Sequence, residues 1–437
     1  MGIKQKRGMC SENEVYMINL LPSIYDIDKL CLLDNINIKY GNAKLIGYVK
    51  AVLSKLFFRE IYVETDKNVS GVVFFKSESS HRADHTKSFS NIYESAGEDK
   101  VLITVNKRNK ISLIRTTKKI VMLAKNMKLF SSVHRLINIL AGIDSLLVAD
   151  DLISELNKID FSSVKFGVVY YDVSKYDYLF IQYLKSYGIE TATLQHAAFI
   201  APRRVKTSNF EFEGVEFLNS TADYFLAWNP FTKDEAIKSG ISKDKIKVLG
   251  IPKYAYYKDE NDGDLKKGKK IFGVVLNARS FDDLNRQLIK YANAAANKFD
   301  CDFVLKYHPQ FKDFIYDDLA DERYFKGHLP LNTSINDYVK LVDFTILSNS
   351  SAFIEFVYLR HKVLRYQAGE YDKFKDVPYF TFKNEKELFP LISNIETEDN
   401  DTIADDDDEL FKYLCYTNKP EIKYAEFFEK VIKGERL

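Results

Sequence analysis

Residues 166–196 read FGVVYYDVSKYDYLFIQYLKSYGIETATLQH, and this stretch decides the fold class. Its first six residues and residues 191–194 are short apolar runs rich in β-branched and aromatic side chains, as is typical of buried strands. Residues 176–187, between them, are long enough and periodic enough to form a helix. Two nearly continuous apolar strands joined through a helix predict a parallel sheet that is covered on both faces.

The same alternation continues in both directions along the chain. A further helix is predicted at 282–298, and the segment 419–437 is predicted to be a last helix that packs back across the lobes. Further strands are predicted at 71–75, 101–104, 223–228, 247–249, 271–276, 302–307, 343–347 and 363–366. We therefore expect an α/β protein with two Rossmann-like lobes that face a central cleft.

A polar stretch divides the chain. At 437 residues the chain is too long for one ordinary core. Residues 258–270, KDENDGDLKKGKK, contain one aliphatic residue, Leu265, and predict an exposed linker. The expected organisation is a first lobe at 1–257, the linker at 258–270, a second lobe at 271–415 and a C-terminal helix at 416–437. A second polar run, 396–409, is predicted to be a solvated loop.

Composition limits the function classes. The 63 basic and 62 acidic residues nearly cancel, so a general polyanion binder, and a nucleic-acid partner, are not expected. The four cysteines form no CxxC pair, which argues against a disulfide framework or a structural zinc site and favours the cytoplasm. No stretch approaches the ~20 apolar residues that cross a bilayer, and no apolar core of signal-peptide length follows the charged N-terminus.

Two candidate site motifs directly follow predicted strands, where ligands of open parallel sheets bind. His196, in Leu194-Gln195-His196, suits a general base that takes a proton from an acceptor hydroxyl. The alternative is a histidine that caps a turn or bonds a buried carbonyl. Lys306 and His308, in Lys306-Tyr307-His308-Pro309, could neutralise a leaving diphosphate, or could be a solvated lysine and an ordinary strand-end histidine.

Two further motifs carry candidate residues. Ser350 and Ser351 begin a predicted helix whose free N–H groups favour a phosphate, and Glu355 one turn later could accept hydrogen bonds from ribose hydroxyls. The same pattern is also an ordinary capping box. His85, with Asp84, follows the strand at 71–75 and could assist the acceptor; the alternative is a solvated loop residue.

The order of these motifs resembles GT-B enzymes of bacterial surface polysaccharide assembly: CDP-glycerol glycerophosphotransferases, capsular Kdo transferases and polysialyltransferases. The resemblance covers about residues 165–370. It implies that His196 is the catalytic base, that His308 and Pro309 correspond to a His-Pro motif contacting donor phosphates, and that Ser350, Ser351 and Glu355 hold the nucleotide. Glu213, beside Gly214, resembles a fragment of the Glu-Asp-Gly-type motif that supplies the polysialyltransferase base, and ranks second to His196.

This sequence departs from the family pattern at two places. Ala197 stands where glycine is usual, so the backbone there is less free to adopt a positive φ. Residues 359–362, LRHK, stand where Gly-Lys-Pro is usual, so the turn after the nucleotide helix must be built differently. Neither departure removes a chemical group from the motifs.

The resemblance implies transfer of a sugar or polyol phosphate from a nucleotide-activated donor to a capsular, teichoic or lipooligosaccharide-type glycan. Inversion and independence of metal are expected, since no Asp-x-Asp follows a predicted strand, and no cofactor is expected. The donor stays open among CMP-, CDP-, UDP- and GDP-linked compounds. A non-hydrolysing NDP-sugar 2-epimerase, which would need several carboxylates around the sugar, and a non-catalytic glycan-binding or scaffold protein remain as alternatives.

Residues 107–128 hold eight basic side chains and no acidic one, interleaved with aliphatic residues. A helix of this kind can lie on an anionic membrane surface or bind a lipid-linked or polyanionic acceptor, which would place the protein at the inner face of the cell membrane. The alternative is a helix with a core face and a solvated basic face. The candidate patch consists of Lys107, Arg108, Lys110, Arg115, Lys118 and Lys119.

Overall fold

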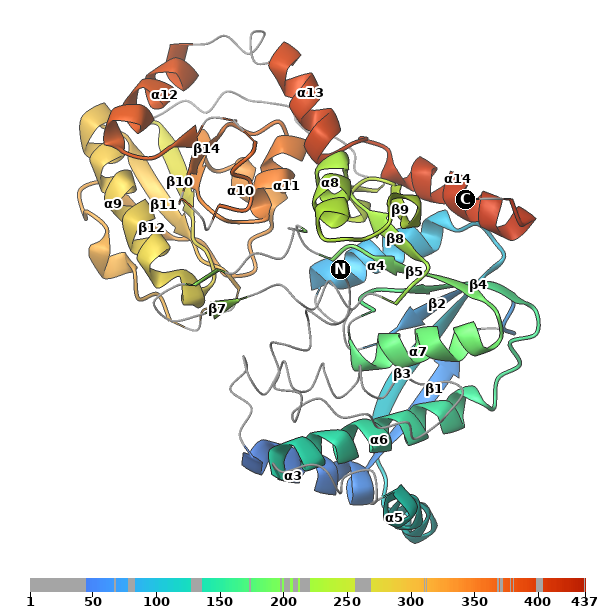
Figure 1. Ribbon diagram of the computed structural model, residues 1–437. Coiled ribbons are helices and arrows are strands. Elements are labelled where there is room, and N and C mark those ends of the chain that lie inside the picture. Colours follow the sequence, from blue (N-terminus) through green and yellow to red (C-terminus); the bar gives the residue numbers. More distant parts are fainter. Residues whose placement is uncertain are drawn as a thin grey trace.

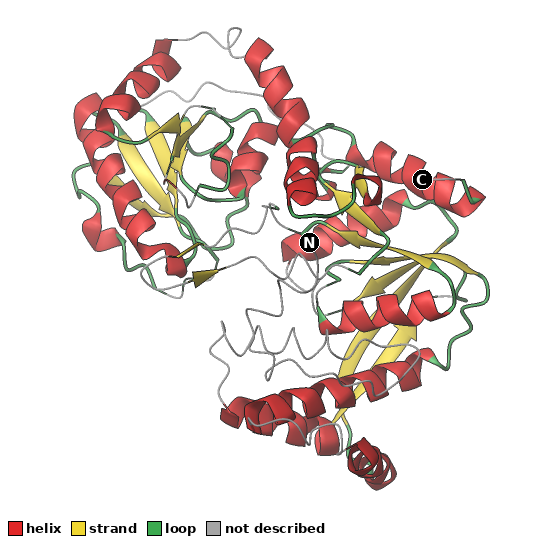
Figure 2. Cartoon of the chain, in the orientation of Figure 1, coloured by secondary structure: helices red, strands yellow, loops and turns green. Residues whose placement is uncertain are grey.

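The structure is a computed structural model of the chain, and its elements form two lobes, each built around a sheet with helices on both faces (Figures 1 and 2). A single extended helix, α14, links the end of the chain to the first lobe. The residues that the structure describes are 45–66, 68–77, 83–126, 136–172, 174–196, 199, 205–206, 211–212, 221–255, 269–309, 311, 313–367, 369, 372–377, 379, 381–397, 404–435 and 437.

The first lobe contains a seven-stranded sheet in its described part, with the order β1-β3-β2-β4-β5-β8-β9. All neighbours pair in parallel except β1 and β3, which are antiparallel. The strands are β1 (Arg59–Thr65), β2 (Gly71–Lys76), β3 (Lys100–Asn109), β4 (Val164–Val169), β5 (Glu190–Leu194), β8 (Tyr224–Ala227) and β9 (Ile246–Val248). A separate pair, β6 (Val205–Lys206) and β7 (Glu211–Phe212), is antiparallel.

Alternating side chains of the first sheet feed two cores. Val73 and Phe75 face the helices α6 and α7, whereas Val72 and Phe74 face α4 and α14, because successive strand residues point to opposite faces (Figure 1). The helices are α3 (Leu45–Leu53), the π-helical turn η1 (Ser54–Phe58), α4 (Ala83–Ser95), α5 (Leu113–Asn126), α6 (Leu136–Leu156), α7 (Lys175–Ser186), α8 (Pro230–Lys238) and the short 3₁₀ turns η5 (Lys243–Lys245) and η6 (Pro252–Tyr254).

The second lobe contains, in its described part, a six-stranded parallel sheet of order β12-β11-β10-β13-β14-β15. Helices α9 and α12 cover one face and α10 and α11 the other. The strands are β10 (Ile271–Val275), β11 (Asp302–Lys306), β12 (Phe325–His328), β13 (Phe344–Leu347), β14 (Val363–Tyr366) and β15 (Thr381–Phe382). The helices are η7 (Arg279–Phe281), α9 (Asp282–Phe299), η8 (Asp317–Leu319), α10 (Ile335–Val339), α11 (Ala352–Tyr358), α12 (Glu385–Thr397) and α13 (Ala404–Leu414).

The last helix, α14 (Pro420–Lys433), returns to the first lobe as predicted. Its aromatic residues enter the core between α4 and the first sheet, and α14 itself lies beside α4 (Figure 1). The Phe428 ring lies 5.4 Å from that of Phe74, and the Phe427 ring lies 5.9 Å from that of Phe166. Two parallel-sheet lobes with a returning helix confirm the predicted fold class.

Two local predictions were wrong. Residues 404–409 of the polar run belong to α13, whose Leu410 and Leu414 pack with the core beside α11, so hydrophobic anchoring at its end overrides the acidic start. In the basic segment, Lys107 and Arg108 lie on strand β3, Lys110 lies in the turn, and the helix begins at Leu113. The predicted domain boundaries and the central cleft stay predictions, and most of the predicted linker lies outside the described residues.

Candidate functional site

The first half of the candidate site lies where β4 and β5 end, side by side in the sheet. His196 follows β5 and is half-buried, and its ring centroid lies 4.0 Å from that of Tyr171, which follows β4. The preceding Gln195 is buried, and its side-chain oxygen accepts the N–H of Trp228 at 2.7 Å. This bond fixes the turn after β5 to the end of β8, so the position of His196 is set by the sheet.

His85 lies in the first turn of α4, which follows β2, and not in a loop. Its ring centroid is 6.2 Å from that of His196, and the two rings are nearly perpendicular. It also lies 4.8 Å from the ring of Tyr170. The structure therefore brings together two candidate residues that are more than a hundred positions apart in the sequence, with two tyrosines that sequence reasoning did not single out.

Asp172 ties the loops of this region together, a role that the sequence did not reveal. Its Oδ2 accepts the backbone N–H groups of Thr221 at 2.8 Å and Ala222 at 3.2 Å. Its own N–H donates to the hydroxyl of Thr193 at 3.2 Å. A buried carboxylate that accepts backbone N–H groups is held in place, so Asp172 links the ends of β4 and β5 to the start of β8.

The second half of the candidate site gathers charges from both lobes around Glu355 of α11. Lys253, in η6, forms an ion pair with Glu355, and the hydroxyl of Tyr254 donates to Glu355 Oε2 at 2.9 Å. Burial, followed by the neighbouring Glu355, raises the pKa of Tyr254 well above its ordinary value, so its hydroxyl remains a donor. Lys253 and Tyr254 were not predicted; they lie at the end of the first lobe's last βα connection.

Lys306, at the end of β11, belongs to the same charged group. Its ammonium donates to the carbonyl oxygen of Thr333 at 2.8 Å. Burial lowers the pKa of Lys306, while attraction to Glu355 opposes this shift and repulsion from Lys253 adds to it. Two lysines and a glutamate are thus close enough to influence one another at the carboxyl end of the second sheet.

The serines before α11 differ from one another in role. Ser350 Oγ accepts the N–H of Ala352 at 3.2 Å, and Ser348 Oγ donates to the Tyr366 carbonyl at 3.1 Å. Ser351 is the N-terminal capping residue, but its side chain makes no capping hydrogen bond. The capping-box interpretation was wrong: Glu355 lies four residues after the N-cap Ser351, where the motif needs three, and it is turned towards Lys253 and Tyr254.

His308 and Pro309 form the turn that follows β11. The carbonyl of His308 accepts the N–H of Phe311 at 3.0 Å, so the chain turns at this point. His308 is half-buried and Pro309 is exposed, which leaves the imidazole close to the end of the strand that carries Lys306. Glu213, the second-ranked base candidate, lies outside the described residues.

Helix α4 connects the two halves of the site. The side-chain amide of Asn91 donates to the carbonyl oxygens of Pro252 at 2.9 Å and Ala255 at 3.3 Å. These carbonyls flank Lys253, which reaches Glu355 in the second lobe. Asn91 lies six residue steps along the helix from His85, a rise of about 9 Å. One rigid helix therefore positions both the histidine pair and the segment that bridges the lobes.

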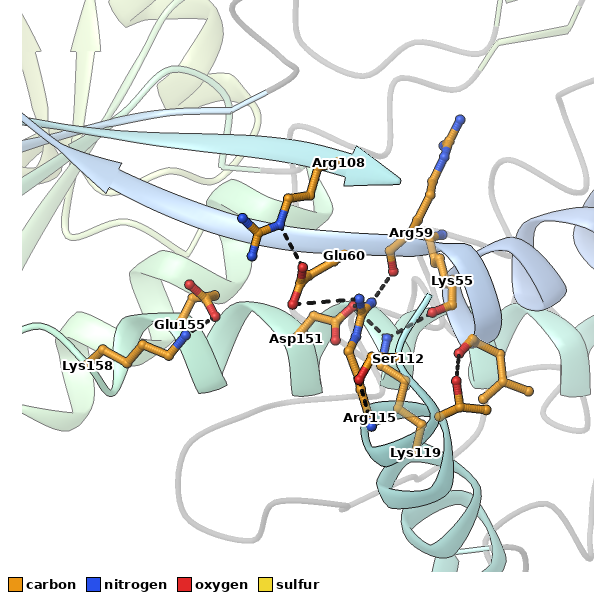
Figure 3. A network of polar contacts seen from close by, with 12 residues as sticks. Lys55, Arg59, Glu60, Arg108, Ser112, Arg115, Lys119, Asp151, Glu155 and Lys158 are labelled. Atoms are coloured by element: carbon orange, nitrogen blue, oxygen red, sulfur yellow. Dashed lines mark hydrogen bonds and ion pairs between the residues drawn. The ribbon is translucent and has the colours of Figure 1, made fainter. Parts of the chain in front are cut away.

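The six residues of the candidate basic patch do not form one exposed face. Lys119 is buried and donates to Asp151 Oδ2 at 2.7 Å, and Arg115 donates to the same oxygen at 3.1 Å (Figure 3). Arg108 pairs with Glu60 at 2.7 Å. The prediction was wrong for Arg115 and Lys119, because α6 presents a buried carboxylate that draws both cations inward. Lys107, Lys110 and Lys118 are exposed.

Among the residues that the structure places, no three His, Cys, Asp or Glu side chains are grouped so that they could hold a metal ion. No described helix has the length and apolar character needed to span a bilayer.

Neither a protein-family model nor a curated protein sequence matches the chain. Several solved structures do resemble it. The UDP-GlcNAc 2-epimerase of Methanocaldococcus jannaschii is 11% identical, covers 83% of this chain and 99% of the epimerase, and gives a TM-score of 0.50. The Neisseria meningitidis enzyme bound to UDP-GlcNAc is 11% identical over 84% of this chain and 100% of its own, with a TM-score of 0.48.

The wall teichoic acid polymerase TagF, in a structure with CDPG, is 12% identical and covers 94% of this chain and 99% of TagF, with a TM-score of 0.48. At these identities the likeness concerns the fold alone. The chain has the GT-B fold of two parallel-sheet α/β lobes.

Proposed function

We propose that this protein is a transferase that moves a sugar or polyol-phosphate unit from a nucleotide-activated donor to a hydroxyl group of a surface glycan or lipid-linked glycan. The observation that carries the proposal is the placement of His196 and His85 together at the carboxyl edge of the first sheet. An acceptor hydroxyl bound between two imidazoles would find a base in one and a hydrogen-bond partner in the other.

The proposed reaction begins when the imidazole of His196 accepts the proton of the acceptor hydroxyl. The hydroxyl oxygen then attacks the reacting carbon or phosphorus of the donor, and the bond to the nucleotide breaks. Lys306 and His308 would neutralise the charge that develops on the leaving phosphate, and Glu355 would hold the ribose. For a sugar donor the reacting carbon is inverted, because a single displacement occurs without a covalent intermediate. No metal ion is required in this scheme.

The ion pair between Lys253 and Glu355 supports a nucleotide-responsive site. A ribose diol that takes Glu355 as its acceptor would compete with Lys253 for the same carboxylate. The released ammonium would then be available to contact the donor phosphates, the role also proposed for Lys306. Because Lys253 belongs to the first lobe and Glu355 to the second, donor binding would alter a contact between the lobes.

The epimerase alternative makes a different demand on the site. Epimerisation at carbon 2 of a nucleotide-sugar would need several acid/base carboxylates around the sugar. At the ends of β4 and β5 the rings beside His196 include the imidazole of His85 and the phenols of Tyr170 and Tyr171. The nearby carboxylate of Asp172 is occupied by backbone N–H groups.

The proposal is tested by incubating the purified protein with CDP-glycerol, CDP-ribitol, CMP-sialic acid, CMP-Kdo, and UDP- and GDP-sugars, each with and without a glycan acceptor. Chromatography then measures the free nucleotide and the unreacted donor. A transferase releases nucleotide in an acceptor-dependent manner. An epimerase would convert the donor without an acceptor, and a scaffold protein would leave every donor intact; either result would refute the proposal.

Matched histidine variants locate the chemistry. His196→Ala is expected to lower acceptor-dependent release by about 10²–10⁴-fold, the range for loss of a general base. His328→Ala is the control, because His328 is also half-buried but bonds Asp317 at 2.6 Å within the second lobe. His308→Ala is expected to lose far more activity than His85→Ala, since charge on the leaving phosphate must be neutralised in every turnover. Equal losses in the last pair would show that the phosphate contacts are misassigned.

A further inference from the structure

Helix α5 turns two of its charged residues inward and exposes several of its apolar residues. Lys119 and Arg115 point inward to Asp151 of α6 (Figure 3). Leu113 and Ile114, by contrast, are 82% and 74% exposed. A helix on the surface of a water-soluble domain normally shows the reverse arrangement. The inward face combines these polar contacts with the partly buried Met122 and Leu123, and the outward face is the unusual one.

The outward face is uncharged over a wide arc. At 100° per residue, six positions of α5 fall within about 120°. These positions are Leu113, Ile114, Thr117, Ile120, Val121 and Ala124, and all six are exposed. The exposed Lys118 lies at the margin of the arc.

The apolar surface extends onto the neighbouring turn. Of the fifteen large apolar side chains that are exposed in the described residues, eight lie in the segments 53–58 and 111–121. We call these eight the apolar ledge: Leu53, Phe57, Phe58, Ile111, Leu113, Ile114, Ile120 and Val121. The other seven are scattered over both lobes, as isolated exposed apolar residues commonly are.

Hydrogen bonds hold the two parts of the ledge side by side. The N–H of Lys110 donates to the carbonyl of Phe58 at 2.7 Å. The hydroxyl of Thr116 donates to the Leu56 carbonyl at 3.2 Å, and Lys119 donates to the Lys55 carbonyl at 2.9 Å. Helix α5 is thus fixed to η1 by its polar face, and the ledge is a continuous feature of the fold. Figure 1 places it at the end of the first lobe that is remote from the second lobe.

Charge indicates what covers the ledge. No acidic residue occurs in the sequence between Asp99 and Asp144, and the exposed cations Lys110 and Lys118 lie next to the apolar arc, one before helix α5 and one on it. An apolar surface bordered by cations matches the boundary between acyl chains and anionic headgroups. A second copy of the chain would bring the same cations together, which opposes self-association.

We propose that the apolar ledge is a docking surface for an anionic lipid bilayer, into which Leu113, Ile114 and Phe58 insert while Lys110 and Lys118 contact the headgroups. The ledge binds the membrane as a peripheral anchor and takes no part in the reaction. The proposal stands on the exposure and charge of α5 and η1 and does not depend on the proposed transferase activity.

The test is flotation of the full chain with vesicles of phosphatidylcholine alone and of phosphatidylcholine mixed equally with phosphatidylglycerol. The protein is expected to float with the mixed vesicles, and high salt is expected to weaken binding. Leu113→Ser/Ile114→Ser is expected to lower the affinity at least about tenfold, from lost apolar insertion. Lys110→Gln/Lys118→Gln is expected to lower it about fivefold per lysine.

The control variant is Leu341→Ser/Ile422→Ser, which removes two exposed apolar side chains away from the ledge and is expected to bind as the unchanged protein does. Failure of the unchanged protein to float with mixed vesicles would overturn the proposal, as would an equal loss in the control.

Hydroxyl-radical labelling without vesicles checks whether the chain itself covers the ledge, and protection of Leu113 would overturn the proposal. The proposal would also be overturned if the unchanged protein forms a dimer that the Leu113→Ser/Ile114→Ser variant no longer forms.

Discussion

Replacing Lys119 by methionine tests the polar anchor that holds α5 against the first lobe. The side chain of Lys119 is 1% exposed and that of Asp151 is 8% exposed, so the ion pair is buried. Removing one partner of a buried pair costs about 3–5 kcal/mol, because the other charge is left uncompensated. Asp151 keeps Arg115 at 3.1 Å, so we expect a smaller loss, about 2–3 kcal/mol.

The loss should appear as faster local opening of α5. At 1.4 kcal/mol per tenfold, a loss of about 2–3 kcal/mol accelerates amide exchange about 30–150-fold. Peptide-resolved hydrogen–deuterium exchange over residues 113–126 measures this directly. Lys118→Met is the control, because the neighbouring Lys118 is exposed and its removal should leave the exchange rate unchanged.

A double variant separates the charge from the packing. Burial lowers the pKa of Lys119 and raises that of Asp151, so desolvation outweighs mutual attraction for both groups. Lys119→Met/Asp151→Leu removes both charges of the pair and leaves Arg115 with Glu60 at 3.9 Å, so exchange should slow again to within about tenfold of the unchanged protein. If Lys119→Met exchanges as slowly as the unchanged protein, the buried pair does not hold the helix and the reasoning fails.

Three further predictions concern the contact between the lobes and the second lobe itself. Tyr254→Phe removes the donor to Glu355 and should lower stability by about 1–2 kcal/mol; an unchanged Tm in thermal unfolding would contradict this. Burial lowers the pKa of Lys306, so its protonated form reduces the free energy of unfolding. Stability should therefore increase as pH rises through the pKa of Lys306 in the folded state. The affinity for the donor, measured by calorimetry, should fall over the same pH range. In Lys306→Met the donor affinity should no longer depend on pH in this range. Gly273→Ala would place a Cβ 1.8 Å from the buried hydroxyl of Tyr338 and should cost about 1–3 kcal/mol, seen as a lower Tm; an unchanged Tm would show that Tyr338 yields freely.

The predicted strands that are recovered best are those buried on both faces. The strands β2, β4 and β10 are nearly continuous apolar runs, which is the pattern that parallel sheets require. Strand β1 was missed because it reads REIYVET, and it lies at the edge of the sheet with mixed exposure. Helix α13 was missed because its acidic start resembles a loop, while its anchoring residues come at its end.

The candidate site could be predicted residue by residue but not as an arrangement. The strand-end positions of His196 and Lys306 follow from the local sequence. The pairing of His196 with His85 depends on the strand order β2-β4-β5, which no local pattern contains. The contact of Lys253 with Glu355 joins residues from different lobes, and their sequence separation of 102 residues hides it.

Helix α5 shows why a periodic pattern can mislead about direction. In a helix where basic and apolar residues alternate, the period is the same whichever of the two faces is buried. Hydrophobicity alone then favours the apolar face as the inner one. The partner that reverses this choice, Asp151, lies 32 residues beyond Lys119. Its carboxylate makes burial of the cations acceptable and leaves Leu113 and Ile114 at the surface.

The most direct test of the central claim is acceptor-dependent nucleotide release by His196→Ala, measured with and without added imidazole. If His196 takes the acceptor proton, release should fall by about 10²–10⁴-fold and recover in part as imidazole enters the vacated space beside Tyr171. A variant that releases nucleotide at the unchanged rate, with no response to imidazole, would contradict the assignment of the catalytic base.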